Sequence, residues 1–187
     1  MTVTESRMNK QVMSEPEVSL RIAMKYICAG EARNVVTVSI DGAHIKTGDT
    51  VHLDIVGFMR KNSWIKCDAE QNRWQGDYQL SPGLPKIVIT SKSGIGDVTI
   101  YLEDGKTLYI ESKKFKGGNS GEYPAMREAI GQLMTNCPES DNVIPVVAVP
   151  YTAKSEGLAQ KWSRNERIRR AGIRFMLIRV NGEIDFI

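Results

Sequence analysis

Hydrophobic positions recur at helical spacing near the start of the chain. Val18, Ile22 and Tyr26 follow a capping signal at Ser14, with Pro16 in the first turn, and the pattern ends at Gly30, which predicts a helix from about residue 15 to 29. The next segment, residues 34–40, is rich in β-branched residues and is closed by Asp-Gly, which predicts a strand followed by a turn.

Residues 47–62 repeat the helical spacing. Val51, Ile55, Phe58 and Met59 fall on one face, and two basic residues suit the carboxyl end, so a second helix is predicted here. A turn at residues 81–85 then precedes a short apolar run at residues 86–90, which predicts a buried strand.

A hairpin is the clearest local signal in the chain. Two β-prone runs, residues 98–102 and 107–110, flank the sequence Glu-Asp-Gly-Lys, and Asp-Gly between such runs is typical of a tight turn. Because the two arms are of similar length, Asp97 and Glu111 are expected to lie close together at the open end of the hairpin. Lys113 is expected on the same strand face as Glu111, since side chains alternate along a strand.

The rest of the chain alternates between helical and strand patterns. The predicted elements are an amphipathic helix at 123–134, a buried strand at 143–149, a helix at 155–171, a strand at 174–180 and, after an Asn-Gly turn, a final strand at 183–187. This order predicts an α/β fold with a mixed central β-sheet flanked by helices.

Composition indicates a globular protein but no particular function. Of the 187 residues, 41% are hydrophobic and 25% charged, with a net charge of +3, which is typical of a globular protein. Three distant cysteines indicate neither a disulfide framework nor a zinc site. Because no apolar run reaches about 20 residues and no signal-peptide pattern is present, we expect a soluble protein in a reducing cytoplasm, away from membranes.

The acids and the lysine at the hairpin end form a candidate catalytic site. Carboxylates such as Asp97 and Glu111 are ligands for Mg²⁺, which neutralises the charge on a phosphodiester and lowers the pKa of bound water. Lys113 would orient or help to deprotonate that water and would stabilise developing negative charge. On its own, a Glu-x-Lys spacing on a strand is usually a solvent-facing ion pair, but the apolar neighbours Ile110 and Phe115 favour a partly buried site.

The pattern Asp97, hairpin, Glu111-Ser112-Lys113 resembles the motif of the PD-(D/E)XK nuclease superfamily, although Gly96 precedes the Asp where the family name has Pro. The resemblance implies a restriction-endonuclease-like core over residues 47–187, with residues 1–46 as an N-terminal extension comprising an arm, a helix and a strand. It implies an endonuclease of restriction, repair or junction type that hydrolyses DNA with Mg²⁺, or with Mn²⁺ in its place.

The resemblance also assigns further site residues. The carbonyl of Ser112 is implied as a third metal ligand and Gln132 as part of the site, although Gln132 fits an ordinary surface position equally well. Family members usually add an acid from the helix before the hairpin, and Asp54, with Asp49 behind it, is the candidate in this chain.

Basic residues supply candidate contacts to DNA. Lys114 and Lys116 precede a glycine-rich stretch, and the spacing of Arg164, Arg167 and Arg170 fits either a solvated helix face or a track of phosphate contacts. A homodimer is implied by the resemblance, since two sites would then reach two strands. Two alternatives stay open: a catalytically inactive module that binds nucleic acid or protein, and a nuclease subunit that is active only with a larger partner.

Overall fold

The computed structural model describes residues 13–71, 73–93, 96–115 and 121–187, and these form an α/β structure around one large mixed sheet. The helices are α1 (Glu15–Cys28), the 3₁₀ turn η1 (Gly42–His44), α2 (Ile55–Lys61), α3 (Glu122–Asn136), α4 (Ala153–Ser163) and α5 (Glu166–Arg170). The strands are β1 (Val36–Ser39), β2 (Lys46–Thr47), β3 (Thr50–Val51), β4 (Ile65–Lys66), β5 (Gly76–Gln79), β6 (Ile87–Thr90), β7 (Val98–Tyr101), β8 (Thr107–Ser112), β9 (Val143–Pro150), β10 (Arg174–Ile178) and β11 (Ile184–Phe186).

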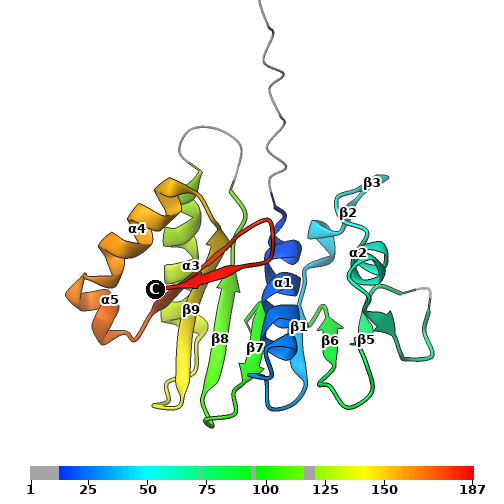
Figure 1. Ribbon diagram of the computed structural model, residues 1–187. Coiled ribbons are helices and arrows are strands. Elements are labelled where there is room, and N and C mark those ends of the chain that lie inside the picture. Colours follow the sequence, from blue (N-terminus) through cyan, green and yellow to red (C-terminus); the bar gives the residue numbers. More distant parts are fainter. Residues whose placement is uncertain (1–12, 72, 94–95, 116–120) are drawn as a thin grey trace, which may run out of the picture.

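The main sheet has nine strands in the order β11-β10-β9-β8-β7-β1-β6-β5-β4, and β2 and β3 form a separate small hairpin. Strands β8, β9 and β10 are parallel to one another, whereas β7 runs antiparallel to both of its neighbours, β8 and β1. Figure 1 shows α1 crossing one face of the sheet near β1 and β7, with α3 on the opposite face behind β8 and β9.

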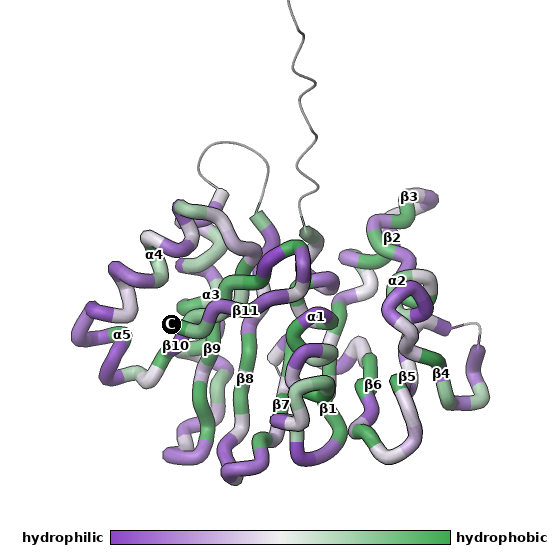
Figure 2. The backbone as a smooth tube through the Cα atoms, viewed as in Figure 1, coloured by the Kyte–Doolittle hydropathy of each residue, from purple (hydrophilic) through white to green (hydrophobic). Residues whose placement is uncertain are grey.

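The strands β8, β9 and β10 are buried on both faces, and their alternate residues enter two different cores. In β9, Val146 and Ala148 pack in the core that α1 covers, whereas Val147 and Val149 pack in the core formed with α3 and α4. Burial on both faces explains why β9 is a nearly continuous apolar run in the sequence. Figure 2 shows the hydrophobic positions concentrated in these strands and the hydrophilic ones in α5 and the loops.

Most predicted elements are confirmed. The helix predicted at 15–29 is α1, and the strands predicted at 34–40, 86–90, 143–149 and 174–180 correspond to β1, β6, β9 and β10. The Asp-Gly hairpin is formed by β7 and β8, and the Asn-Gly turn joins β10 to the antiparallel β11.

Two predicted helices are wrong in their extent. In the first, only Ile55–Lys61 is helical, because Gly48 adopts a left-handed φ of 57° in the turn between β2 and β3. Val51, which the helical spacing placed on the apolar face, is 60% exposed. The second helix, predicted at 155–171, is divided into α4 and α5, because the Asn165 side chain caps a new helix by accepting hydrogen bonds from the Arg167 and Ile168 N–H groups.

The N-terminal segment belongs to the same sheet as the rest of the chain. Strand β1 lies between β7 and β6, and the apolar residues of α1 are buried in the core beneath that helix. Residues 13–46, placed by the sequence in an extension, therefore contribute a central strand and a packed helix. The predicted N-terminal arm lies almost entirely outside the described residues. Within the described ranges, no helix is long and apolar enough to cross a membrane.

Candidate active site

Asp97 and Glu111 face each other at the open end of the β7–β8 hairpin. The last antiparallel pair is Val98 with Ile110, so Asp97 and Glu111 are the next residues of the two arms. The backbone N–H of Asp97 donates to the Ile110 carbonyl at 2.9 Å, and its carboxylate accepts the Ser112 N–H at 2.8 Å. The hairpin thus fixes the Asp97 side chain directly beside the Glu-x-Lys strand, as the sequence predicted.

Gly96, the residue before Asp97, has a backbone conformation that excludes proline. Its φ is +72°, which a proline ring cannot adopt. A Cβ atom at this position would lie 3.0 Å from Cε1 of Tyr109, so the aromatic ring packs directly against the glycine backbone. The local conformation of this chain therefore excludes proline at position 96.

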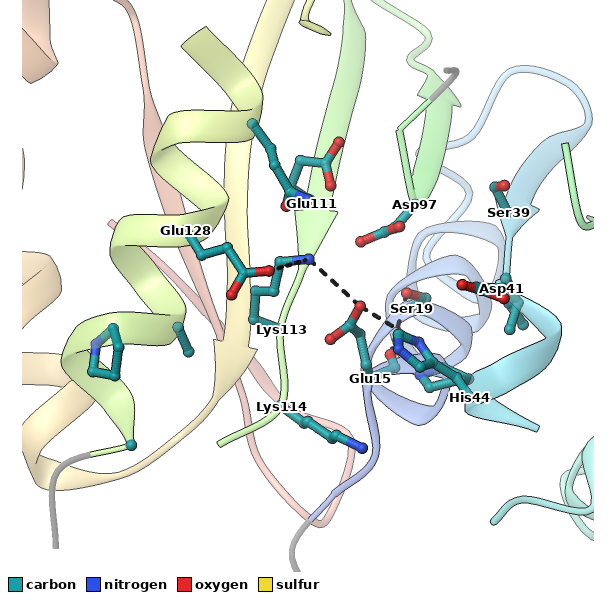
Figure 3. Close-up of a pocket in the computed structure, with 16 residues that line it drawn as sticks. Glu15, Ser19, Ser39, Asp41, His44, Asp97, Glu111, Lys113, Lys114 and Glu128 are labelled. Atoms are coloured by element: carbon teal, nitrogen blue, oxygen red, sulfur yellow. Dashed lines mark hydrogen bonds and ion pairs between the residues drawn. The ribbon is translucent and has the colours of Figure 1, made fainter. Parts of the chain in front are cut away.

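Lys113 is buried between two further carboxylates. Its side chain lies at the end of β8, and its Nζ atom is 3.5 Å from Glu15 Oε1 and 3.6 Å from Glu128 Oε1. Figure 3 shows the ammonium group between these two acids, one from α1 and one from α3. Burial lowers the pKa of Lys113, but the negative charges of the surrounding carboxylates outweigh burial and raise it, so the side chain is a cation at neutral pH.

Glu15 is the site residue that the sequence analysis missed. It opens α1, where an acid in the first turn has an ordinary explanation as a partner of the helix dipole. In the structure its carboxylate also lies 3.6 Å from Nδ1 of His44, so it links α1 to both η1 and β8. A signal for it existed, because α1 precedes the hairpin and carries acids, but the resemblance was limited to residues 47–187.

The two hairpin acids have unusual titration behaviour. Burial, and then the negative charge of Glu111, raise the pKa of Asp97 to about 7, although the Ser112 N–H and Lys113 act in the opposite direction. Burial also raises the pKa of Glu111, against the lowering influence of Lys113 and of a hydrogen bond with Asp97. Two carboxyl groups held this close resist carrying two negative charges unless a cation joins them.

These residues line one pocket of about 440 Å³, which we call the acid pocket. Its carboxylates outnumber its lysines: the acids are Glu15, Asp41, Asp97, Glu111 and Glu128, and the lysines are Lys113 and Lys114. Gln132 lines the same pocket from α3, and its Oε1 atom is buried without a hydrogen-bond partner among the described residues. The structure therefore gathers Asp97, Glu111, Lys113 and Gln132 in one place.

The acid pocket provides a partial ligand set for a hard divalent cation. In the described part of the chain, no three His, Cys, Asp or Glu side chains are grouped as a metal site. The Ser112 N–H donates to the Asp97 carboxylate. The Ser112 carbonyl faces the same side of β8, because the N–H and C=O groups of one strand residue point toward the same neighbouring strand. Two carboxylates and this carbonyl fit Mg²⁺, which usually keeps several water ligands.

Asp54 and Asp49 are not part of the pocket lining. The Asp54 carboxylate accepts the Gly57 N–H at 2.9 Å and caps α2, which explains its place before an apolar helix without any role in chemistry. The Ile55–Lys61 helix is therefore not the source of an acid for the pocket, whereas α1 is.

The predicted DNA contacts are only partly near the acids. Lys114 lines the acid pocket, while Lys116 lies outside the described residues. Arg170 lines a separate hollow with Lys106, the residue before β8. Lys106 and Glu111 are five strand residues apart, which is about 16 Å, so the acid pocket is distant from this hollow. Arg164 and Arg167 are exposed beside it, at the end of α4 and in α5.

Comparison with known proteins assigns no function to this chain, so the function is inferred from the residues of the site. No protein-family model matches the chain, and neither curated proteins nor solved structures give a significant match.

Proposed function

We propose that this protein is a Mg²⁺-dependent endonuclease that hydrolyses DNA phosphodiester bonds, with a restriction-endonuclease-like core of the PD-(D/E)XK type. One observation carries the proposal: a pair of carboxyls, the half-buried Asp97 and the buried Glu111, lies beside a lysine held as a cation by two further acids. A structural ion pair needs one acid for each base, whereas this pocket holds a surplus of negative charge that a metal ion would balance.

The hairpin residues would hold the metal. Asp97, Glu111 and the Ser112 carbonyl are the proposed ligands of Mg²⁺, or of Mn²⁺ in its place. When bound, the ion supplies a Lewis acid for the phosphate and lowers the pKa of a coordinated water. Gln132 reaches the same pocket from α3 with an unpartnered oxygen, which suits it to orient a water molecule or a substrate group.

Lys113 acts in this proposal as a cation and not as a base. Because its pKa is raised, it keeps its proton at neutral pH and presents an ammonium group to the scissile phosphate and the attacking water. Glu15 and Glu128 are positioning residues, since each lies within 3.6 Å of the Lys113 Nζ atom. Glu15 thereby supplies, from α1, the helix acid for which the sequence suggested Asp54.

The arrangement of the chain supports the same class of enzyme. A hairpin bearing the acids, a parallel strand β9 beside it and helices on both faces agree with the elements that the resemblance implies. In this proposal the core also includes α1 and β1, because Glu15 lies in the site. We further propose that the enzyme works inside the cell as a homodimer, so that two acid pockets reach two strands.

Purified protein incubated with supercoiled plasmid should nick or linearise it in Mg²⁺, and EDTA should abolish the reaction, because Asp97 and Glu111 need a cation before a phosphate can approach. Gel electrophoresis measures the products. Plasmid that stays intact in both Mg²⁺ and Mn²⁺ would favour the catalytically inactive binding module. Cleavage that persists in EDTA would contradict a metal-dependent reaction.

A further inference from the structure

A second hollow adjoins the acid pocket and shares three of its acids, Asp41, Asp97 and Glu111. It has a volume of about 310 Å³, and Asp97, Glu111 and Gln132 line both spaces. Ser39, at the end of β1, also lines both spaces, and Asn136, at the end of α3, lines the second hollow alone. We call this space the serine hollow, since Ser39, Ser91 and Ser93 line it.

Two buried polar atoms in its wall lack partners. Tyr109 is only 5% exposed, and its hydroxyl group lies near the Gly96 N–H but forms no hydrogen bond of normal geometry with the described residues. The Oε1 atom of Gln132 is also buried without a hydrogen-bond partner among the described residues. Buried polar groups are nearly always hydrogen-bonded, so two unpaired ones in the wall of one hollow indicate a ligand that pairs with them.

The lining favours an uncharged ligand. Among the described residues of the serine hollow there is no lysine, arginine or histidine, whereas the adjoining acid pocket has Lys113 and Lys114. The Asp41 carboxylate would repel a phosphate placed in the serine hollow, and no described basic side chain there would offset this repulsion. Hydroxyl and amide side chains suit a neutral group that carries both hydrogen-bond donors and acceptors.

A nucleobase has these properties, and it would lie next to a phosphate. We propose that the serine hollow binds the base of a nucleotide adjacent to the scissile phosphate, with the Tyr109 hydroxyl and Gln132 Oε1 as hydrogen-bond partners. The inference rests on the proposed nuclease function and names its substrate class. A base enters such a hollow only when it is outside the helical stack, so the preferred substrate is DNA with an unpaired nucleotide at the cut.

The volume agrees with this ligand. A space of about 310 Å³ lies at the lower end of the range of small-molecule pockets, which suits one nucleoside. Gly96 keeps the hollow in its present shape, because a side chain there would meet the Tyr109 ring at 3.0 Å and displace the hydroxyl group.

The test compares labelled duplexes that differ only in one nucleotide at the cut, which is either fully paired or unpaired. Wild-type protein should cleave the unpaired substrate about tenfold faster, a ratio that corresponds to the lower part of the range for one recognised base. Tyr109→Phe, which removes only the hydroxyl group, should lose most of this preference. Tyr101→Phe, on the exposed part of β7, is the matched control and should keep it.

A binding measurement separates this inference from the nuclease proposal. Fluorescence anisotropy with the same two DNAs in Ca²⁺ should show tighter binding of the unpaired DNA by wild-type protein than by Tyr109→Phe, whether or not cleavage occurs. Equal cleavage of paired and unpaired DNA would overturn the inference and leave the nuclease standing. A preference that survives in Tyr109→Phe, or the absence of any preference in both assays, would also overturn it.

Discussion

Replacing Lys113 with methionine should lower the rate of Mg²⁺-dependent DNA cleavage by about 100-fold or more, the usual effect of removing one preorganised electrostatic group. The buried ammonium group stabilises charge that develops on the phosphate, and methionine has a similar length without that charge. Glu111→Gln should have an effect of about 1000-fold, because it removes a metal ligand as well as a charge. Single-turnover cleavage of a labelled duplex measures both rates.

Lys25→Met is the matched control for the lysine variant. Lys25 is exposed in the last turn of α1, at the opposite end of that helix from Glu15. This control should cleave DNA like wild type, and circular dichroism should show that all three variants are folded. Wild-type rates in folded Lys113→Met and Glu111→Gln proteins would show that the acid pocket is not the catalytic site.

The free energy of unfolding in the absence of divalent cations should fall as the pH rises from about 5 to 8, because the pKa of Asp97 is about 7 in the folded protein and 3.8 ordinarily. Between pH 3.8 and about 7, Asp97 binds a proton in the folded state and has lost it in the unfolded state. The stability contributed by Asp97 is therefore complete below pH 3.8 and is lost as the pH rises through about 7. Each unit of difference corresponds to about 1.4 kcal/mol, and Glu111 acts with the same sign.

Mg²⁺ should reverse this loss, since a cation binds the ionised carboxylates and only in the folded state. The increase in melting temperature on adding Mg²⁺ should therefore be larger at pH 8 than at pH 5. Asp97→Asn should flatten the pH dependence and remove most of the Mg²⁺ effect, whereas Glu139→Gln, at an exposed position, should change neither. A Mg²⁺ effect that is the same at both pH values would contradict the titration assigned to Asp97.

Local sequence patterns were sufficient for the centre of the site. The Asp-Gly turn sets the length of the β7–β8 hairpin, and the pairing of Val98 with Ile110 follows from that length. The approach of Asp97 to Glu111 was therefore predictable from a few consecutive residues. The continuous apolar run of β9 likewise predicted a central strand, since burial on both faces removes the alternation of polar and apolar residues.

Long-range pairing was not predictable in this way. Strand β1 lies between β7 and β6, and nothing in residues 36–39 specifies either neighbour. The role of Glu15 depends on that placement, because α1 reaches the end of β8 only when β1 is part of the sheet. The sequence favoured Asp54 because it lies in the helix predicted at 47–62, before the hairpin, but its carboxylate accepts the Gly57 N–H.

The errors in helix length have a similar origin. Spacing alone extended one helix through Gly48 and another through Asn165, although a left-handed glycine and a capping asparagine interrupt them. Gly96 shows the opposite case, in which a departure from a family motif has a physical cause in the chain: its φ of +72° leaves no place for proline.

Isothermal titration calorimetry with Mg²⁺ and Mn²⁺ measures directly whether the hairpin acids form a metal site. Wild-type protein should bind the ion with an affinity that is lost in Glu111→Gln and in Asp97→Asn. Asp54→Asn is the matched control, since Asp54 caps α2 away from the acid pocket, and it should bind like wild type. No binding by wild-type protein, or equal binding by Glu111→Gln, would contradict the account.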